Sequence, residues 1–224
     1  MWFRKSKKTP ASTENQAEGD LDKIIREEFF ASEDAGVFVD IGAARPDYLS
    51  MSALYRSLGW NVIGIEPNPK FCELHAEKGI HILQYACGEH DEDDVDFQVV
   101  NSHGSNYGNG KVSYESFSSL ALKDSYAAIA KDLDVTTIKV KLRRLDTILA
   151  EHAPEVERID ILSADVEGWE LEVINGLDVD RYKPRVMVIE NLFDEKKYYE
   201  HMDKLGYDLW RVVAPNDVYV RRDD

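Results

Sequence analysis

Short apolar runs alternate with amphipathic segments along most of the chain. The run VFV at 37–39 is β-branched and aromatic, which is typical of a strand buried on both faces. Apolar residues then recur at helical spacing over 51–58, with Ser50 as a possible N-cap, and Gly59 follows as a stop signal. The pattern therefore predicts a strand, a turn and a helix in succession.

The same alternation continues to the end of the chain. Predicted strands lie at 37–39, 61–66, 80–85, 89–100, 137–142, 159–163, 185–189, 207–214 and 218–221. Predicted helices lie at 21–30, 51–58, 69–78, 123–133 and 195–205, with a further helix opened by Glu167 and Glu170. This order predicts an α/β fold with a doubly wound, mostly parallel seven-stranded sheet, an antiparallel C-terminal hairpin and an inserted loop and strand region.

Composition divides the chain into two parts. Residues 1–19 are polar, with a basic start and no apolar stretch, so we expect a disordered tail. Residues 20–224 suit a single domain, because one core can grow to roughly 250 residues. No apolar run is long enough to span a membrane, which predicts a cytoplasmic protein without stable membrane insertion.

The net charge of −16 argues against nucleic acid as a partner, because such a surface repels a phosphate backbone. The two cysteines, Cys72 and Cys87, are too few for a disulfide scaffold. Composition therefore argues against two classes of protein without naming a partner.

Candidate chemistry begins where the first strand ends, at Asp40 and Gly42. A strand, a glycine turn and a helix N-terminus form a ligand platform in open α/β sheets. A dinucleotide would require further glycines here and would meet the wrong charge at Asp40. The charged methionine end of S-adenosylmethionine instead favours a carboxylate. Glu66, at the end of the second strand, can accept ribose hydroxyls of either cofactor.

Five segments of the chain resemble the FkbM-type methyltransferase family of class I S-adenosylmethionine-dependent enzymes. They are VDIGA (39–43), GIEPNP (64–69), RLDTIL (144–149), DVEGWELEVINGL (165–177) and VMVIEN (186–191). The resemblance implies a Rossmann-like methyltransferase fold and O-methylation of a sugar, glycan or glycosylated metabolite, as in polysaccharide modification, so the partner it implies is a small-molecule or glycan acceptor. The chain departs from the family's usual GANxG loop at Ala44 and Pro46.

The resemblance also assigns the cofactor-binding residues. It places Asp40, Gly42 and Ala43 on the methionine side, Glu66 at the ribose and Asp165 in the signature after the fourth strand. From their position after the third predicted strand, we expect Ala86 and Cys87 to lie against the adenine.

Catalytic candidates gather at the ends of two further strands. Asp165 and the pair Glu190-Asn191 follow neighbouring strands, which brings their oxygens to one rim of the sheet. They resemble the magnesium sites of some class I O-methyltransferases, and they serve equally well as hydrogen-bond acceptors. Glu167 belongs to the same signature, and His103, in a polar loop, titrates near neutrality. We expect Asp165, Glu167 and His103 to be catalytic.

Two other functions remain open from the residues alone. One is a nicotinamide-dependent oxidoreductase on the same architecture. The other is a non-catalytic module that binds the cofactor or scaffolds an assembly.

Overall fold

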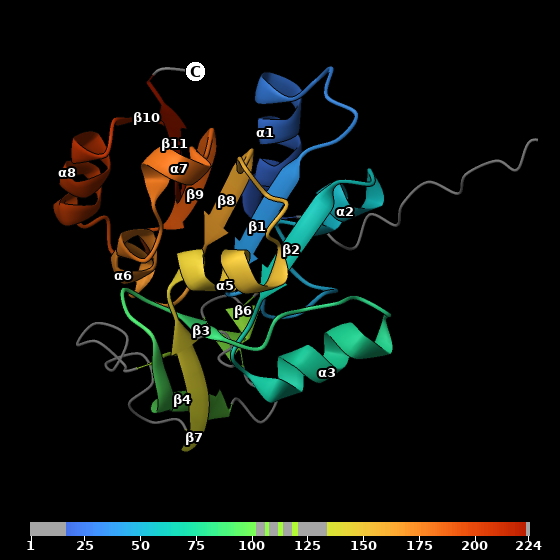
Figure 1. Cartoon of the computed structure of the whole chain (residues 1–224), viewed down its shortest axis with the longest axis vertical. Coiled ribbons are helices and arrows are strands. Elements are labelled where there is room, and N and C mark those ends of the chain that lie inside the picture. The colour runs from blue at the N-terminus through green and yellow to red at the C-terminus, as the bar shows by residue number, and fades with distance from the viewer. Residues whose placement is uncertain (1–16, 102–105, 108–111, 114–117, 121–133, 223–224) are drawn as a thin grey trace, which may run out of the picture.

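The computed structural model describes residues 17–101, 106–107, 112–113, 118–120 and 134–222. Its main sheet has six strands in the order β10-β11-β9-β8-β1-β2. Their bounds are β1 (Val37–Ile41), β2 (Asn61–Ile65), β8 (Ile161–Ala164), β9 (Val186–Glu190), β10 (Tyr207–Val213) and β11 (Asn216–Arg221). Strands β2, β1, β8 and β9 are parallel, whereas β11 is antiparallel to β9 and to β10 (Figure 1).

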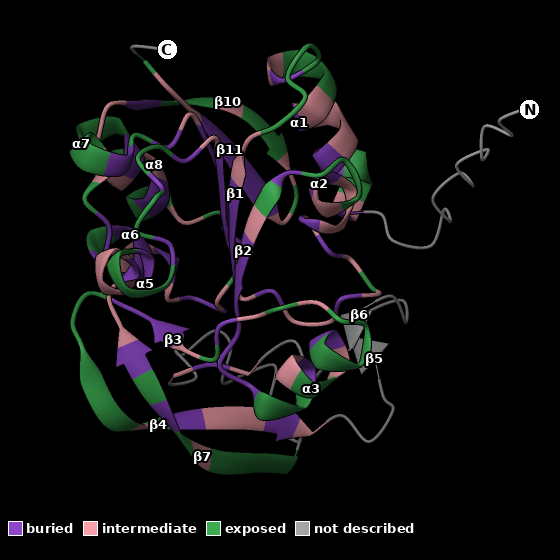
Figure 2. Ribbon diagram, turned by 45° about the vertical axis from the view of Figure 1, so that its right-hand side comes forward, coloured by how far each residue is buried: buried purple, intermediate pink, exposed green. Residues whose placement is uncertain are grey.

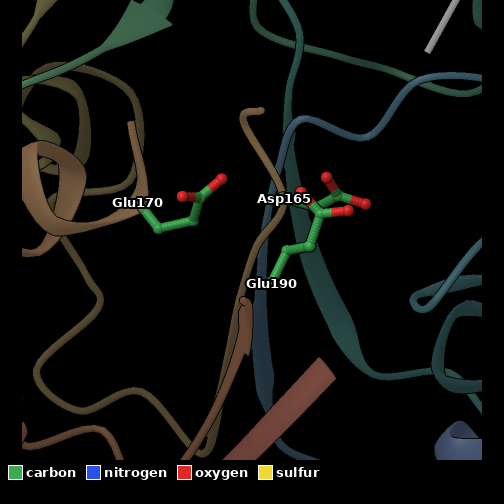
Figure 3. Close-up of side chains that lie close together, drawn as sticks. All are labelled: Asp165, Glu170 and Glu190. Atoms are coloured by element: carbon green, nitrogen blue, oxygen red, sulfur yellow. The ribbon is translucent and has the colours of Figure 1, made fainter. Parts of the chain in front are cut away.

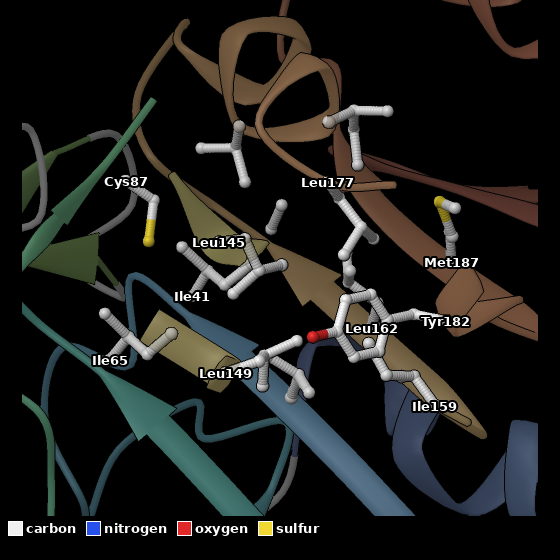
Figure 4. Packing of buried hydrophobic residues seen from close by; sticks show 14 of the residues in the cluster. Ile41, Ile65, Cys87, Leu145, Leu149, Ile159, Leu162, Leu177, Tyr182 and Met187 are labelled. Atoms are coloured by element: carbon white, nitrogen blue, oxygen red, sulfur yellow. The ribbon is translucent and has the colours of Figure 1, made fainter. Parts of the chain in front are cut away.

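Helices cover both faces of this sheet (Figure 2). One face carries α1 (Leu21–Phe29) and α2 (Ala53–Ser57), and the other carries α5 (Leu145–His152), α6 (Glu170–Asn175), α7 (Val179–Tyr182) and α8 (Lys196–Lys204). Side-chain alternation along each strand fills both cores. Phe38 and Ile161 pack with the first pair of helices, whereas Val39 and Leu162 pack in the larger cluster on the other face (Figure 4).

A second sheet faces the carboxyl ends of the parallel strands (Figure 1). It has the order β3-β7-β4, with β3 (Ala86–Cys87), β4 (Glu92–Asn101) and β7 (Asp134–Arg143). A short pair, β5 (Asn106–Tyr107) and β6 (Val112–Ser113), lies in the inserted region, and α3 (Pro69–Glu77) follows β2. The second sheet therefore lies over the carboxyl edge of the main sheet, where the parallel strands end.

The prediction of seven strands is wrong at the third one. Of residues 80–85, only Leu83 pairs with β2, through a single bridge to Ile65. The chain then leaves the main sheet, because Ala86 pairs with Leu142 of β7 in the second sheet. The main sheet is thus six-stranded and mixed.

Local end signals are confirmed for α3. The Asn68 side chain accepts a hydrogen bond from the Lys70 amide at 3.1 Å, and Pro69 occupies the first helical position. Gly79 ends the segment with a φ of +70°. The helix α2 begins at Ala53, later than the predicted 51, because the preceding residues form turns.

The predicted boundary of the tail is too late. Ala17 is buried, and residues Glu18–Asp20 form a short 3₁₀ helix, η1, directly before α1. Residues 1–16 and the predicted helix at 123–133 lie outside the described residues. No helix in the described part of the chain is long and apolar enough to cross a membrane.

Candidate active site

A cavity of about 270 Å³ lies at the carboxyl edge of the main sheet and extends to the second sheet. Six acidic side chains line it: Glu18, Asp40, Glu66, Asp165, Glu167 and Glu190. The apolar parts of the cavity wall include Phe71, Cys87 and Phe97. Apolar walls with a few polar groups are typical of sites for small molecules.

Asp40 is the next-to-last residue of β1 and is buried, with 5% of its surface exposed. The Ser52 hydroxyl donates a hydrogen bond to it, and the charge of Arg56 attracts it. Burial outweighs both effects and raises the pKa of Asp40. Sequence reasoning identified Asp40 but missed these two partners, which the first turn of α2 and its preceding residue supply.

Gly42 lies in the loop after β1 with a φ of +77°. A Cβ atom at this position would stand 1.8 Å from the carbonyl oxygen of Asp165. Only glycine allows this close approach of two backbone segments. The amides of Gly42 and Ala43 both donate to the Ile65 carbonyl, at 3.0 and 3.2 Å, so the loop is also held to β2.

Glu66 holds the next part of the same loop. Its carboxylate accepts hydrogen bonds from the amides of Asn68 at 2.7 Å and Ala44 at 2.9 Å. A ring nitrogen of His75 lies 3.1 Å from the Ala44 carbonyl oxygen, and Ala44 has a φ of +41°. Burial raises the pKa of Glu66 to about 7. These contacts fix a loop that lacks the family's usual asparagine and second glycine.

Glu170 begins α6 and shapes the signature turn before it. One carboxylate oxygen accepts the amides of Val166 and Gly168, at 3.0 and 2.9 Å. The other accepts the Tyr198 hydroxyl of α8 at 2.6 Å. Glu170 is buried and all its described contacts are internal, so it positions the turn.

Asp165 and Glu190 follow adjacent strands and share a hydrogen bond. Oxygens of Asp165, Glu170 and Glu190 all lie within 4.8 Å of one another (Figure 3). The Asp165 side chain faces the open space of the cavity, yet the surrounding protein raises its pKa to about 8. Loss of water contributes most, and the charge of Glu170 adds to it.

The side chain of Asn191, the third predicted metal ligand, is engaged in hydrogen bonds within the protein, and its metal role stays a prediction. Its amide nitrogen donates to an Asp217 oxygen at 2.8 Å, and its amide oxygen accepts the Glu195 amide at 2.8 Å. These bonds tie the end of β9 to β11 and to the residue before α8. Asp165 and Glu190 remain as a two-carboxylate set, which suits an Mg²⁺ ion that keeps several waters.

Glu167 lies in the turn before α6, whereas the sequence pattern predicted that it opens this helix. Its φ is +58° and it is 5% exposed. One of its carboxylate oxygens is buried without a hydrogen-bond partner among the described residues. The predicted catalytic role of Glu167 is therefore compatible with its place in the cavity wall.

Three further predicted site residues are Ala86, Cys87 and His103, and the cavity also contains one acid that the sequence did not indicate. Ala86 and Cys87 are buried and line the cavity, and their place against the adenine stays a prediction. His103 lies outside the described residues, so its catalytic role stays a prediction. Glu18 was missed, because an isolated acid in a polar tail carries no signal. It reaches the cavity from η1, where the Asn216 side chain donates to it at 3.1 Å.

Comparison with known proteins places these features in a family. A model described as the methyltransferase FkbM domain matches residues 40–209. "Methyltransferase sdnD" of Sordaria araneosa is 42% identical over 60 residues, covering 24% of this chain and 23% of that protein. "Methyltransferase 1" of Beauveria bassiana is 35% identical over 74 residues, covering 33% and 29%. The chain therefore spans less than a third of the curated relatives it matches.

A solved FkbM methyltransferase from Methylobacillus flagellatus KT aligns with a TM-score of 0.47 and 15% identity, over 86% of this chain and 46% of that one. The family assignment rests on the family model, which covers most of the chain. Its span includes the Asp40 loop and the whole signature from Asp165 onward. The protein thus belongs to the FkbM methyltransferase family.

Proposed function

We propose that the protein transfers a methyl group from S-adenosylmethionine to a hydroxyl of a sugar, glycan or glycosylated metabolite. The observation that carries this proposal is the meeting of Asp40, Glu66 and the Asp165–Glu190 pair in one cavity. Family membership supports methyl transfer. The choice of cofactor and of acceptor atom is argued from the side chains.

The cofactor side of the cavity combines charge with apolar wall. Asp40 presents a carboxylate to the ammonium and sulfonium groups, and Glu66 retains lone pairs for ribose hydroxyls beyond the two amides it accepts. Phe71 and Cys87 offer apolar surface to the adenine. When bound, the cofactor supplies an electrophilic methyl group on a positively charged sulfur.

The acceptor hydroxyl has to lose a proton as it attacks. Asp165 and Glu190 hold one hydrogen bond between them, and this pair is placed to accept that proton. Glu170 and Gly42 fix the backbone on either side of Asp165, so the base is held in place. Alignment of the two reactants within the enclosed cavity supplies much of the remaining acceleration.

Calorimetric titration with S-adenosylhomocysteine tests the cofactor assignment. The wild type is expected to bind it, and Asp40→Asn is expected to weaken binding at least about tenfold, because a buried charge partner is lost. Asp34→Asn, which changes an exposed acid before β1, should leave binding unchanged. Preference for NADH, or full affinity in Asp40→Asn, would contradict the proposal.

Transfer of labelled methyl groups to hydroxylated acceptors then separates an enzyme from a binding module. We expect transfer by the wild type and its loss in Glu190→Gln, which removes the partner of Asp165, with S-adenosylhomocysteine affinity kept within about threefold. Running each reaction with EDTA and with Mg²⁺ tests whether Asp165 and Glu190 also hold a metal ion. Cofactor binding without any turnover would favour a non-catalytic module.

A further inference from the structure

Four cavity carboxylates interact with one another, and we call them the acceptor cluster: Glu18, Asp165, Glu167 and Glu190. Asp165 is hydrogen-bonded to Glu190, and the charge of Glu18 acts on both Asp165 and Glu167. Among the described residues that line the cavity, Arg45 has the one permanently cationic side chain, which is partly exposed and paired with Asp47. The cluster therefore has no cationic partner among the described residues apart from Arg45, and burial raises the pKa values of Glu18, Asp165 and Glu167, so an entering cation would favour their ionised forms.

Glu167 gives independent evidence that a ligand belongs here. Its side chain lines the cavity and is more than nine-tenths buried, yet one carboxylate oxygen lacks a partner among the described residues. A buried carboxylate is costly unless it is paired and hydrogen-bonded. The missing partner is a hydrogen-bond donor, and because the neighbours Glu18 and Asp165 are acids, a positively charged donor is favoured most.

The geometry favours an organic cation over a metal ion for this partner. The carboxylates whose oxygens converge within 4.8 Å are Asp165, Glu170 and Glu190, and neither Glu18 nor Glu167 belongs to that group. A cation shared by Glu18 and Glu167 therefore lies beside the converging oxygens and not among them, where it has to supply hydrogen-bond donors. A primary ammonium group has three N–H donors and meets this requirement.

We propose that the acceptor of the methyl transfer carries an ammonium group, and that Glu18 and Glu167 bind it. The inference rests on the proposed function, since the accepting hydroxyl belongs to the same molecule. Glu18 then selects amino-bearing acceptors, while Asp165 and Glu190 remain beside the hydroxyl.

Glu18 is held in place before any ligand arrives. The preceding Ala17 is 3% exposed, and the Asn216 amide donates to the Glu18 carboxylate at 3.1 Å. A Cβ atom on Gly19, whose φ is +59°, would lie 2.6 Å from a Val213 methyl group. A segment packed this closely presents its acid in one orientation, which is what selection by charge requires.

The test compares hydroxylated amines with their N-acetylated forms, beginning with glucosamine and N-acetylglucosamine. Each pair keeps its hydroxyls and differs in charge. Calorimetry with S-adenosylhomocysteine-saturated protein in EDTA gives affinities, and labelled methyl transfer gives activities. In at least one pair, the amine is expected to bind at least tenfold tighter, and Glu18→Gln should remove most of that preference.

Two controls separate the possible failures. Glu28→Gln, on the exposed side of α1, should keep the full preference, and unchanged S-adenosylhomocysteine affinity shows that Glu18→Gln is folded. If the cofactor analogue binds but no pair prefers the amine, this inference is overturned and the proposed function stands. If the preference survives Glu18→Gln, the assignment of Glu18 is overturned. Failure to bind the analogue would overturn both proposals.

Discussion

Ala44 shows at the residue scale how a loop keeps its shape where the family pattern has an asparagine. A φ of +41° is uncommon for a residue with a side chain. The Glu66 carboxylate, directly after β2, accepts a hydrogen bond from the Ala44 amide. The His75 ring, on α3, lies against the Ala44 carbonyl oxygen. Glu66 therefore acts first on the protein itself, and this role leaves lone pairs available to a ligand.

The buried state of Glu66 predicts a specific pH dependence of stability. Burial raises its pKa from 4.5 to about 7, so the folded state binds this proton more tightly than the unfolded state. The protonated carboxyl therefore contributes stability that is complete below pH 4.5 and is lost as the pH rises to about 7. Glu66→Gln cannot titrate and should lack this part of the decline.

Thermal unfolding of the ligand-free protein at about pH 5 and pH 8 measures the effect. The melting temperature of the wild type should fall further than that of Glu66→Gln between the two conditions. Glu73→Gln, on the exposed face of α3, should follow the wild type. Equal falls in all three proteins would show that Glu66 keeps an ordinary pKa.

The site residues that the sequence predicted share one property. Asp40, Glu66, Asp165 and Glu190 each lie in the last two residues of a parallel strand or directly after one, and the carboxyl ends of such strands meet at one edge. Glu18 was missed because it reaches that edge from outside the alternating pattern. The hydrogen bonds of Asn191 could not be predicted for a similar reason, since its partners Asp217 and Glu195 lie on or beside other elements.

At the element scale, local signals were enough for α3 but not for the third strand. The ends of α3 depend on Asn68, Pro69 and Gly79, which act within their own segment. Residues 80–85 have an apolar content typical of a strand, but their pairing is decided by distant chain. Because β3 pairs with β7, more than fifty residues later, the sequence pattern alone could not show that the segment changes sheets.

The tie between α6 and α8 gives a prediction about elements. The Tyr198 hydroxyl donates to Glu170, and Tyr198→Phe would leave a buried carboxylate oxygen without its donor. We expect the free energy of unfolding to fall by about 1–3 kcal/mol. Tyr85→Phe should cost less, because that hydroxyl meets a ring nitrogen of His152, at 3.1 Å, in an exposed position. Urea denaturation of both variants measures the two losses in free energy of unfolding. Equal losses would show that the Tyr198–Glu170 hydrogen bond stabilises the fold no more than an exposed one.

At the scale of the whole molecule, the cavity lies between two sheets, and each sheet contributes a different kind of side chain to its lining. The main sheet supplies acids such as Asp40 and Asp165, whereas the second sheet supplies the apolar residues Ala86, Cys87 and Phe97. These residues are far apart in the sequence. A ligand that fills the cavity has to contact both sheets at once, so its binding energy stabilises both.

Hydrogen exchange with and without S-adenosylhomocysteine tests this arrangement directly. Exchange should slow together in the loop at 40–44 and in the segment at 86–97, because a ligand between the sheets suppresses local opening of each. Helix α7, on the far side of the core from the cavity lining, should exchange at an unchanged rate. Slower exchange in the loop alone would mean that the second sheet takes no part in binding. In that case Ala86 and Cys87 would not form the adenine wall, and the cofactor would lie against the main sheet only.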